Sequence, residues 1–345
     1  MRTWDKRRAP RTLARMVPVR HIRLADNSVY LLEAGGERLL IDTGPDYRGS
    51  REALAAALEG VRPSLVVATH GHLDHAGLGG WWQAQGASVA IHQEDLHYTS
   101  GHQLDEAELA ALEAYVRGCG APREIVDEAV ATLAARRAWT QMARERGGAY
   151  PASGRDHRWP SGLRYEPFAP ARLLADAATE VAPGVFAVAS PGHTPGNMVV
   201  WVPSERWLFS GDQLLPEITP IPAIQSYRAH PGAPWRFRSL PRFLDSLAGI
   251  RESGATRCFP GHGEPFDHVN AVIDANLQQA EQRTERVREA LIERGGGTVW
   301  ELAEAIYPRA VRRRFWQIIS TIQGHLDVLE EQGRAASGDG RWVAV

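Results

Sequence analysis

The sequence lacks the features of membrane proteins, of disulfide-rich secreted proteins and of strongly basic nucleic-acid-binding proteins. No apolar stretch approaches the roughly 18 residues that a membrane helix needs, and no signal-peptide pattern follows the basic start. The only two cysteines, Cys119 and Cys258, lie far apart and give no disulfide framework. A formal net charge of -2 gives no overall electrostatic attraction for nucleic acid. We therefore expect a cytoplasmic protein without a membrane partner.

The chain has an ordinary globular composition, with 43% hydrophobic and 23% charged residues over 345 positions. This length suffices for two domains, or for one large domain with an appendage. Cys258 lies in a short strand-like stretch, where the role of a small buried residue is expected rather than that of a metal ligand.

A cluster of histidine and aspartate residues lies just after an apolar run that predicts a buried strand. His70, His72, Asp74 and His75 fall there within six residues. In a turn that leaves a strand, the two first histidines can point to one side while the other two side chains follow the bend, so the four can serve two adjacent ions. Imidazole and carboxylate suit zinc, and iron or manganese accept the same ligands. The alternative is a histidine-rich surface turn.

This His-x-His-x-Asp-His pattern resembles the metal-binding motif of the metallo-β-lactamase superfamily. Four other stretches are similar to further motifs of that family, in the expected order: Leu39–Gly44, Ser190–Gly196, Phe209–Asp212 and Phe259–Gly263. The resemblance covers roughly residues 27–263. It implies an α/β fold, an αββα sandwich of two packed sheets with helices on the flanks. It is much less specific for the substrate, because one such site serves many reactions.

The resemblance also implies which residues bind metal. Two divalent ions, most simply Zn²⁺ with Fe or Mn as alternatives, would be held by three side chains each and bridged by a seventh. The three groups are His70, His72 and His193; then Asp74, His75 and His262; and the bridging Asp212. Two such ions can share a water, lower its pKa and present a bridging hydroxide for hydrolysis.

Two aspartates of this set, Asp74 and Asp212, are the predicted catalytic residues, since Asp74 can also orient the hydroxide. Asp42 follows a predicted strand and corresponds to a carboxylate that orients a ligand in the family. The alternative for Asp42 is a simple aspartate turn before Gly44. The adjacent stretch 50–59 predicts an amphipathic helix with Ser50 as its N-cap.

The segment 93–176 is the main departure from a minimal family member. It carries helical patterns at 104–118 and 121–146 and a loop-like stretch rich in Gly, Pro and Arg. Both ends of this helical insertion return to predicted metal-binding loops, so we expect it to lie over the metal cleft as a lid. Five residues are candidates for substrate contact: Tyr98, His102, Arg155, His157 and Trp159.

The C-terminal stretch 269–345 predicts three helices and a two-stranded hairpin. It resembles the winged-helix appendage of a glyoxalase II-like bacterial branch and of β-lactamase-like 2 proteins. The predicted domains are therefore a metallo-β-lactamase-like domain over 1–268 and a helical, winged-helix-like domain over 269–345. Such modules can bind nucleic acid, but only Arg312–Arg314 forms a basic cluster. A role in packing or in forming a homodimer is favoured.

Several residues separate the chain from individual relatives. Asp212 argues against dinuclear β-lactamases, which lack this bridge, and His72 argues against flavin-linked di-iron proteins, which carry a glutamate there. The complete second site argues against mononuclear persulfide dioxygenases. Gln213 and Asn197 replace histidines of glyoxalase-type relatives. These replacements weaken the inference that this chain acts on the glyoxalase substrate.

The leading hypothesis is a metal-dependent hydrolase of a small carbonyl substrate: a thioester, an ester or a lactone. The alternative is a phosphodiesterase or ribonuclease of the same superfamily, which the winged-helix resemblance motivates. A third hypothesis is a DNA-binding regulator that senses a ligand. It is least favoured, because a sensor needs neither a bridging carboxylate nor an activated water.

Overall fold

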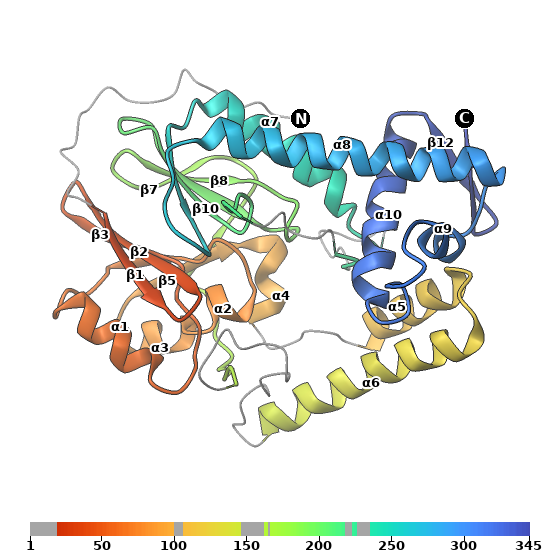
Figure 1. The fold of residues 1–345 in the computed structure, drawn as a ribbon. Helices are drawn as coiled ribbons and strands as arrows, with labels where there is room; N and C mark the ends of the chain where they lie inside the picture. The colour runs from red at the N-terminus through yellow and green to blue at the C-terminus, as the bar shows by residue number, and fades with distance from the viewer. Residues whose placement is uncertain (1–18, 100–105, 146–161, 165, 218–222, 226–234) are drawn as a thin grey trace. The chain divides into compact units, whose positions relative to one another are not determined.

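A computed structural model of the chain describes residues 19–99, 106–145, 162–164, 166–217, 223–225 and 235–345. The chain divides into two compact units (Figure 1). Unit 1 comprises residues 1–103, 139–220 and 246–272, and unit 2 comprises 104–138, 221–245 and 273–345. Four of the predicted substrate contacts lie outside the described residues: His102, Arg155, His157 and Trp159.

The first sheet of unit 1 has six strands in the order β1-β2-β3-β4-β5-β6. Strands β1 to β3 form an antiparallel meander, and Gly35 and Gly36 adopt positive φ in the turn between β2 and β3. Strands β3 to β6 run parallel, so their carboxyl ends meet at one edge. The strands are β1 Arg20–Leu24, β2 Asn27–Ala34, β3 Glu37–Ile41, β4 Leu65–Val67, β5 Ser88–His92 and β6 Arg172–Leu174.

The second sheet of unit 1 has five strands in the order β11-β10-β9-β8-β7. All its neighbours pair antiparallel except β10 and β11, which are parallel. The strands are β7 Thr179–Ala182, β8 Val185–Ala189, β9 Met198–Val202, β10 Trp207–Gly211 and β11 Arg257–Pro260.

The two sheets share one apolar core, in which Tyr30 and Leu32 of β2 meet Val200 and Phe209 of the second sheet. The other face of the first sheet is covered by α1 (Ser50–Leu58) and α3 (Gly79–Ala84), as Figure 1 shows. In α7 (Ser239–Ser253), the unit 1 residues Leu247 and Ile250 are buried. The predicted αββα fold is confirmed.

One local prediction is wrong. Ser50 is not the N-cap of α1, because Gly49 takes that position with a φ of 91° and Ser50 is already helical. The Ser50 hydroxyl instead turns back and donates to the Tyr47 carbonyl at 2.8 Å. A left-handed backbone suits glycine, which lacks a Cβ, so the chain enters the helix through Gly49 rather than through a side-chain cap.

Unit 2 is mainly helical. Its core joins Val116 and Ile125 to Leu291, Ile319 and Trp342, which lie far apart along the chain. The helical part of the insertion therefore shares a core with C-terminal helices. The elements of this unit are α5 Glu106–Gly118, α6 Arg123–Glu145, α8 Val269–Arg294, α9 Val299–Ile306, α10 Phe315–Glu331, β12 Ala335–Gly338 and β13 Arg341–Ala344, and α6, α7 and α8 contribute residues to both units.

The predicted insertion also contains elements of unit 1. The short helices η1 (Gln93–Asp95) and α4 (Leu96–Thr99) follow β5 directly, and β6 extends the first sheet. The lid role and the winged-helix identity of the C-terminal elements stay predictions. Among the helices that the structure describes, none is both long and apolar enough to cross a membrane.

Candidate metal centre

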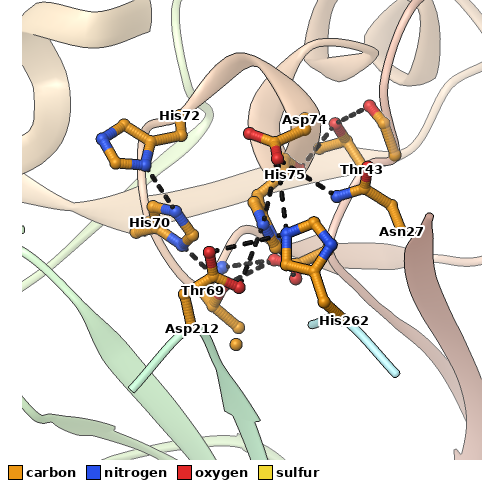
Figure 2. A network of polar contacts seen from close by, with 12 residues as sticks. Asn27, Thr43, Thr69, His70, His72, Asp74, His75, Asp212 and His262 are labelled. Atoms are coloured by element: carbon orange, nitrogen blue, oxygen red, sulfur yellow. Dashed lines mark hydrogen bonds and ion pairs between the residues drawn. The ribbon is translucent and has the colours of Figure 1, made fainter. Parts of the chain in front are cut away.

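The structure brings all seven predicted metal ligands together in unit 1, although they are spread over about 190 positions of sequence. Figure 2 labels all of them except His193. Each lies beyond the end of a strand, in a loop or in a short helix. His70 and His72 follow β4, Asp74 and His75 lie in α2 (Leu73–Ala76), His193 lies between β8 and β9, Asp212 follows β10, and His262 follows β11.

Three histidines form a compact group that we call the histidine triad: His70, His72 and His193. The Nδ1 atom of His72 lies 3.0 Å from Nε2 of His70 and 3.0 Å from Nε2 of His193. Nitrogen ligands on a tetrahedral ion with bonds of about 2.0–2.1 Å are separated by roughly 3.3 Å. The spacing of the triad is close to this requirement.

A second group, the mixed triad, consists of Asp74, His75 and His262. Asp74 Oδ2 lies 3.4 Å from His262 Nε2 and 3.7 Å from His75 Nε2. One carboxylate oxygen and two imidazole nitrogens are again a ligand set that suits a divalent transition metal.

Asp212 lies between the two triads. Its Oδ2 is 3.5 Å from His193 Nε2 of the histidine triad and 3.5 Å from His262 Nε2 of the mixed triad. Its Oδ1 is 3.3 Å from His75 Nε2. A carboxylate in this position can contact ions in both groups.

The polar atoms of the site fit a bound cation better than they fit one another. His75 Nε2 and Asp212 Oδ1 are buried, and neither has a well-aligned hydrogen bond to any described residue. Leaving such a buried group unpaired costs about 1–3 kcal/mol. A cation between them would use both lone pairs, so these residues fit a bound divalent ion.

Asp42 fixes the orientation of two histidines from behind, as predicted for this residue. Its Oδ2 accepts a hydrogen bond from His75 Nδ1 at 2.8 Å, and its Oδ1 accepts from the backbone N and hydroxyl of Thr69 at 2.7 and 2.8 Å. The Thr69 oxygen lies 3.2 Å from His70 Nδ1 and can accept its proton. Both Nε2 lone pairs are therefore turned into the site.

The mixed triad has supports of its own. His262 Nδ1 donates to the Asp26 carbonyl at 3.0 Å, which directs Nε2 toward Asp74 and Asp212. The buried Asn27 side chain donates to Asp74 Oδ2 at 3.4 Å (Figure 2). These contacts join the β1–β2 turn to the centre.

The electrostatics of the site favour positive charge. Burial alone would lower the pKa of His262, but hydrogen bonds to Asp212 and Asp74 raise it to about 10. Burial would likewise raise the pKa of Asp212, yet the surrounding histidines hold it well below its ordinary value. At His72, burial and the neighbouring His193 outweigh the opposing effect of Asp74 and Asp212 and lower its pKa to about 3, which leaves its nitrogens free of an added proton.

Gln213 and Asn197, which depart from the family pattern, brace the His193 loop. The Gln213 Oε1 accepts from the His193 backbone N at 3.4 Å, and Asn197 Nδ2 donates to the Ser190 carbonyl at 3.1 Å. Both side chains are fully buried. These two residues therefore hold the loop that carries His193, and the triads are formed without histidine at either position.

Tyr98 is the one candidate substrate contact within the described residues. Its ring lies edge-on to His72, with centroids 5.6 Å apart, and is half-buried. The sequence did not single out Thr69, Asn27 or Asp95, which all support the site. For Asp95 a signal was present, because it closely follows a parallel strand just as Asp42 does.

Comparison with known proteins settles the family. A model of the metallo-beta-lactamase superfamily matches residues 23–262. The chain belongs to the metallo-beta-lactamase superfamily. Membership makes it a metal-dependent hydrolase and agrees with the two sheets and the candidate metal site.

Individual relatives of this superfamily match most of the chain. The probable metallo-hydrolase YqjP of Bacillus subtilis is 25% identical over 319 residues, which are 90% of this chain and 89% of that protein. The atrochrysone carboxyl ACP thioesterase of Aspergillus fumigatus is 23% identical over 304 residues, covering 84% of this chain and 70% of the thioesterase.

A solved structure shares the fold over nearly the whole chain. The metallo-beta-lactamase family protein TTHA1429 of Thermus thermophilus superimposes with a TM-score of 0.67 and 24% identity, and the match covers 96% of this chain and 98% of that one.

Proposed function

We propose that this superfamily member is a dinuclear metal hydrolase that acts on a small carbonyl substrate, namely a thioester, an ester or a lactone. The observation that carries the proposal is the position of Asp212, with one oxygen 3.5 Å from a ligand atom of each triad. A single ion would need only one triad, whereas a carboxylate between two triads suits a pair of ions.

Two divalent ions bound here would acidify a shared water and polarise the carbonyl oxygen of the substrate. The seven side chains are the proposed ligands, and zinc is the metal that best matches their nitrogen and oxygen atoms. Asp42 and Asp26 keep the Nε2 atoms of His75 and His262 turned inward. Asp74 has one oxygen toward His262 and Asn27, and we assign its other oxygen to orient the attacking water.

The substrate class draws support from similarity to the ACP thioesterase over 84% of this chain. It also draws support from charge: the chain is near neutral overall, which does not favour a polyanionic substrate. The exposed Arg312–Arg314 cluster at the start of α10 is the feature that supports the nuclease alternative.

The proposal is tested by turnover of a thioester, an ester and a lactone by the zinc-loaded protein, beside a labelled single-stranded RNA. The Asp212→Ala variant should lose at least about 100-fold in kcat/KM for the carbonyl substrate. Asp127→Ala, which removes a half-exposed aspartate of α6, is the control and should keep wild-type activity.

A loss of less than tenfold in Asp212→Ala would contradict the dinuclear mechanism. Cleavage of RNA without carbonyl turnover would move the function to the nuclease branch. In that case affinity for RNA should fall steeply with salt, and should fall further when Arg312, Arg313 and Arg314 are replaced by glutamine.

A further inference from the structure

Asp95 is a buried carboxylate that the assignment of metal ligands does not use. It ends η1, just beyond β5, and its relative exposure is 0%. No basic side chain among the described residues forms an ion pair with it, and burial raises its pKa to about 6. Burying an acid without a cation is unfavourable compared with burying an apolar side chain. The carboxylate therefore needs a specific role to explain its position.

The hydrogen bonds of Asp95 supply that role, because they join two metal-binding loops. Its Oδ2 accepts from the Gly71 backbone N at 2.8 Å and from the Thr194 hydroxyl at 2.7 Å, and its Oδ1 accepts from the Gly196 backbone N at 2.7 Å. Gly71 lies between the first two members of the histidine triad, and Thr194 directly follows the third. One carboxylate thus holds the backbone beside all three histidines.

The packing around these loops leaves no room for adjustment. A Cβ atom added to Gly196 would lie 2.7 Å from the backbone N and from Oδ1 of Asp95. A Cβ added to Gly71 would lie 2.4 Å from the Tyr98 ring. Real Cβ atoms essentially never lie this close to another heavy atom, so a side chain at either glycine would force the loop away from its neighbour.

The sheet places Asp95 as the counterpart of Asp42. Strands β3 and β5 flank β4 on its two sides, and all three run parallel, so the residues after them meet at one edge. Asp42, after β3, contacts a member of the mixed triad directly. Asp95, beyond β5, contacts only the backbone and the hydroxyl of the loops that carry the histidine triad.

We propose that Asp95 is the positioning residue of one metal site: it holds the His72 and His193 loops together and thereby sets the affinity of the histidine triad, but not that of the mixed triad. The proposal rests on the proposed dinuclear function, since it assigns a separate ion to each triad. In this role Asp95 acts through the two loops and is not itself one of the metal ligands.

The isosteric variant Asp95→Asn tests this role sharply. An amide has one oxygen and one NH2 group in place of two oxygens. If its oxygen faces Gly71 and Thr194, its NH2 group opposes the Gly196 N–H. If it is flipped, the NH2 group opposes the Gly71 N–H. Either orientation leaves one backbone donor without an acceptor, with almost no change in side-chain volume.

The measurement is the dissociation constant for Zn²⁺ in two full-length backgrounds that each retain one triad. His262→Ala keeps the histidine triad, and His193→Ala keeps the mixed triad. Adding Asp95→Asn should weaken zinc binding by about 10–100-fold in the first background and by less than about threefold in the second. The control is Asp46→Asn, which alters another buried carboxylate of unit 1, bonded to Arg51, and should not distinguish the backgrounds.

An equal loss in both backgrounds, or no loss in His262→Ala, would overturn the proposal by making Asp95 a general structural residue. If a background fails to bind zinc, release of zinc to a chelator from Asp95→Asn with all seven ligands decides instead. One ion should leave faster than in the wild type and the other at the wild-type rate, and uniform release overturns the idea. Failure of the wild type to bind two ions would contradict the dinuclear function itself, which is a separate result.

Discussion

The metal centre of unit 1 and the cluster around Asp327 in unit 2 both bury polar side chains, but they satisfy them differently. In unit 2, the Asp327 carboxylate accepts from both terminal nitrogens of Arg236, at 2.5 and 2.8 Å, and from Gln323 Nε2 at 2.8 Å. The Gln323 oxygen in turn accepts from the Tyr115 hydroxyl at 3.0 Å. This network is complete within the protein, so it stabilises one arrangement of helices.

In unit 1, the buried polar atoms of the metal centre face one another without completing their hydrogen bonds. His75 Nε2 and Asp212 Oδ1 are the clearest examples. Two histidines also differ in what surrounds them, because nearby carboxylates raise the pKa of His262 to about 10, whereas burial lowers that of His325 in unit 2 to about 4. A complete network indicates a structural role, and an incomplete one indicates a site for a ligand.

Among these predictions, removal of metal should have the largest effect. It should affect the metal centre of unit 1 and leave the Asp327 network of unit 2 unchanged. We expect chelation to lower carbonyl hydrolysis by more than about 1,000-fold, because the residues alone supply neither the acidified water nor the polarised carbonyl. Added Zn²⁺ at about 100 times its dissociation constant should stabilise unit 1 by about 2.7 kcal/mol. Activity and metal content are measured together. Full activity in metal-free protein would contradict the conclusion that the incomplete cluster of unit 1 is a metal site.

Breaking the complete network should come next in size. Asp327→Ala leaves Arg236 and Gln323 without their buried partner, so we expect a loss of about 3–5 kcal/mol in the stability of unit 2. Hydrogen exchange of peptides from α10 measures it. The control is Glu331→Ala, which removes a more exposed partner of Arg242 and should cost less than about 1 kcal/mol. Equal effects of the two variants would show that the network contributes no more than a surface pair.

His325 provides a smaller, pH-dependent comparison. The unfolded chain takes up a proton near the ordinary pKa of 6.5, but the folded chain does so only near 4, so stability rises with pH between these values. From pH 7.5 to 5.5 this group should cost unit 2 about 1 kcal/mol. His325→Gln should remove that part of the pH dependence in urea unfolding. His268→Gln, at an exposed histidine, should retain it, and an unchanged profile in His325→Gln would refute the assignment.

The smallest expected effect concerns a local cap rather than the network. Thr298 and Glu301 form a reciprocal capping box at the start of α9. Thr298→Ala should lower the stability of unit 2 by about 1 kcal/mol. Thr321→Ala, whose exposed hydroxyl bonds within α10, should have little effect in the same unfolding measurement. A loss of stability in Thr298→Ala as large as that in Asp327→Ala would show that the helix cap contributes as much to unit 2 as the buried network does.

Local patterns predicted most of the elements that the structure contains. The helical patterns at 104–118 and 121–146 correspond to α5 and α6. Two failures have physical reasons. Ser50 resembles an N-cap, but the left-handed Gly49 makes a different entry to the helix. Strand β6 is only three residues long and is stabilised by pairing with β5, which no local pattern reveals.

At the metal site too, short motifs could be predicted from the sequence, whereas contacts between distant segments could not. The seven proposed ligands were predictable because they stand in short motifs that resemble those of the superfamily. Asp95 was not predicted, since its role depends on two loops that approach it from distant parts of the chain. The shared core of α5 and α6 with the C-terminal helices was equally hidden, because an apolar helix face does not specify its partner.

The sequence by itself thus determined the resemblance to the family, because the motifs depend on residue type and on spacing along the chain, and that resemblance implied the two-sheet fold and the metal ligands. The tertiary structure decided which oxygen faces which nitrogen, which buried carboxylate holds which loop, and which helices share a core. Those features depend on distances between residues far apart in sequence, and only the pairing of strands and the packing of side chains set such distances.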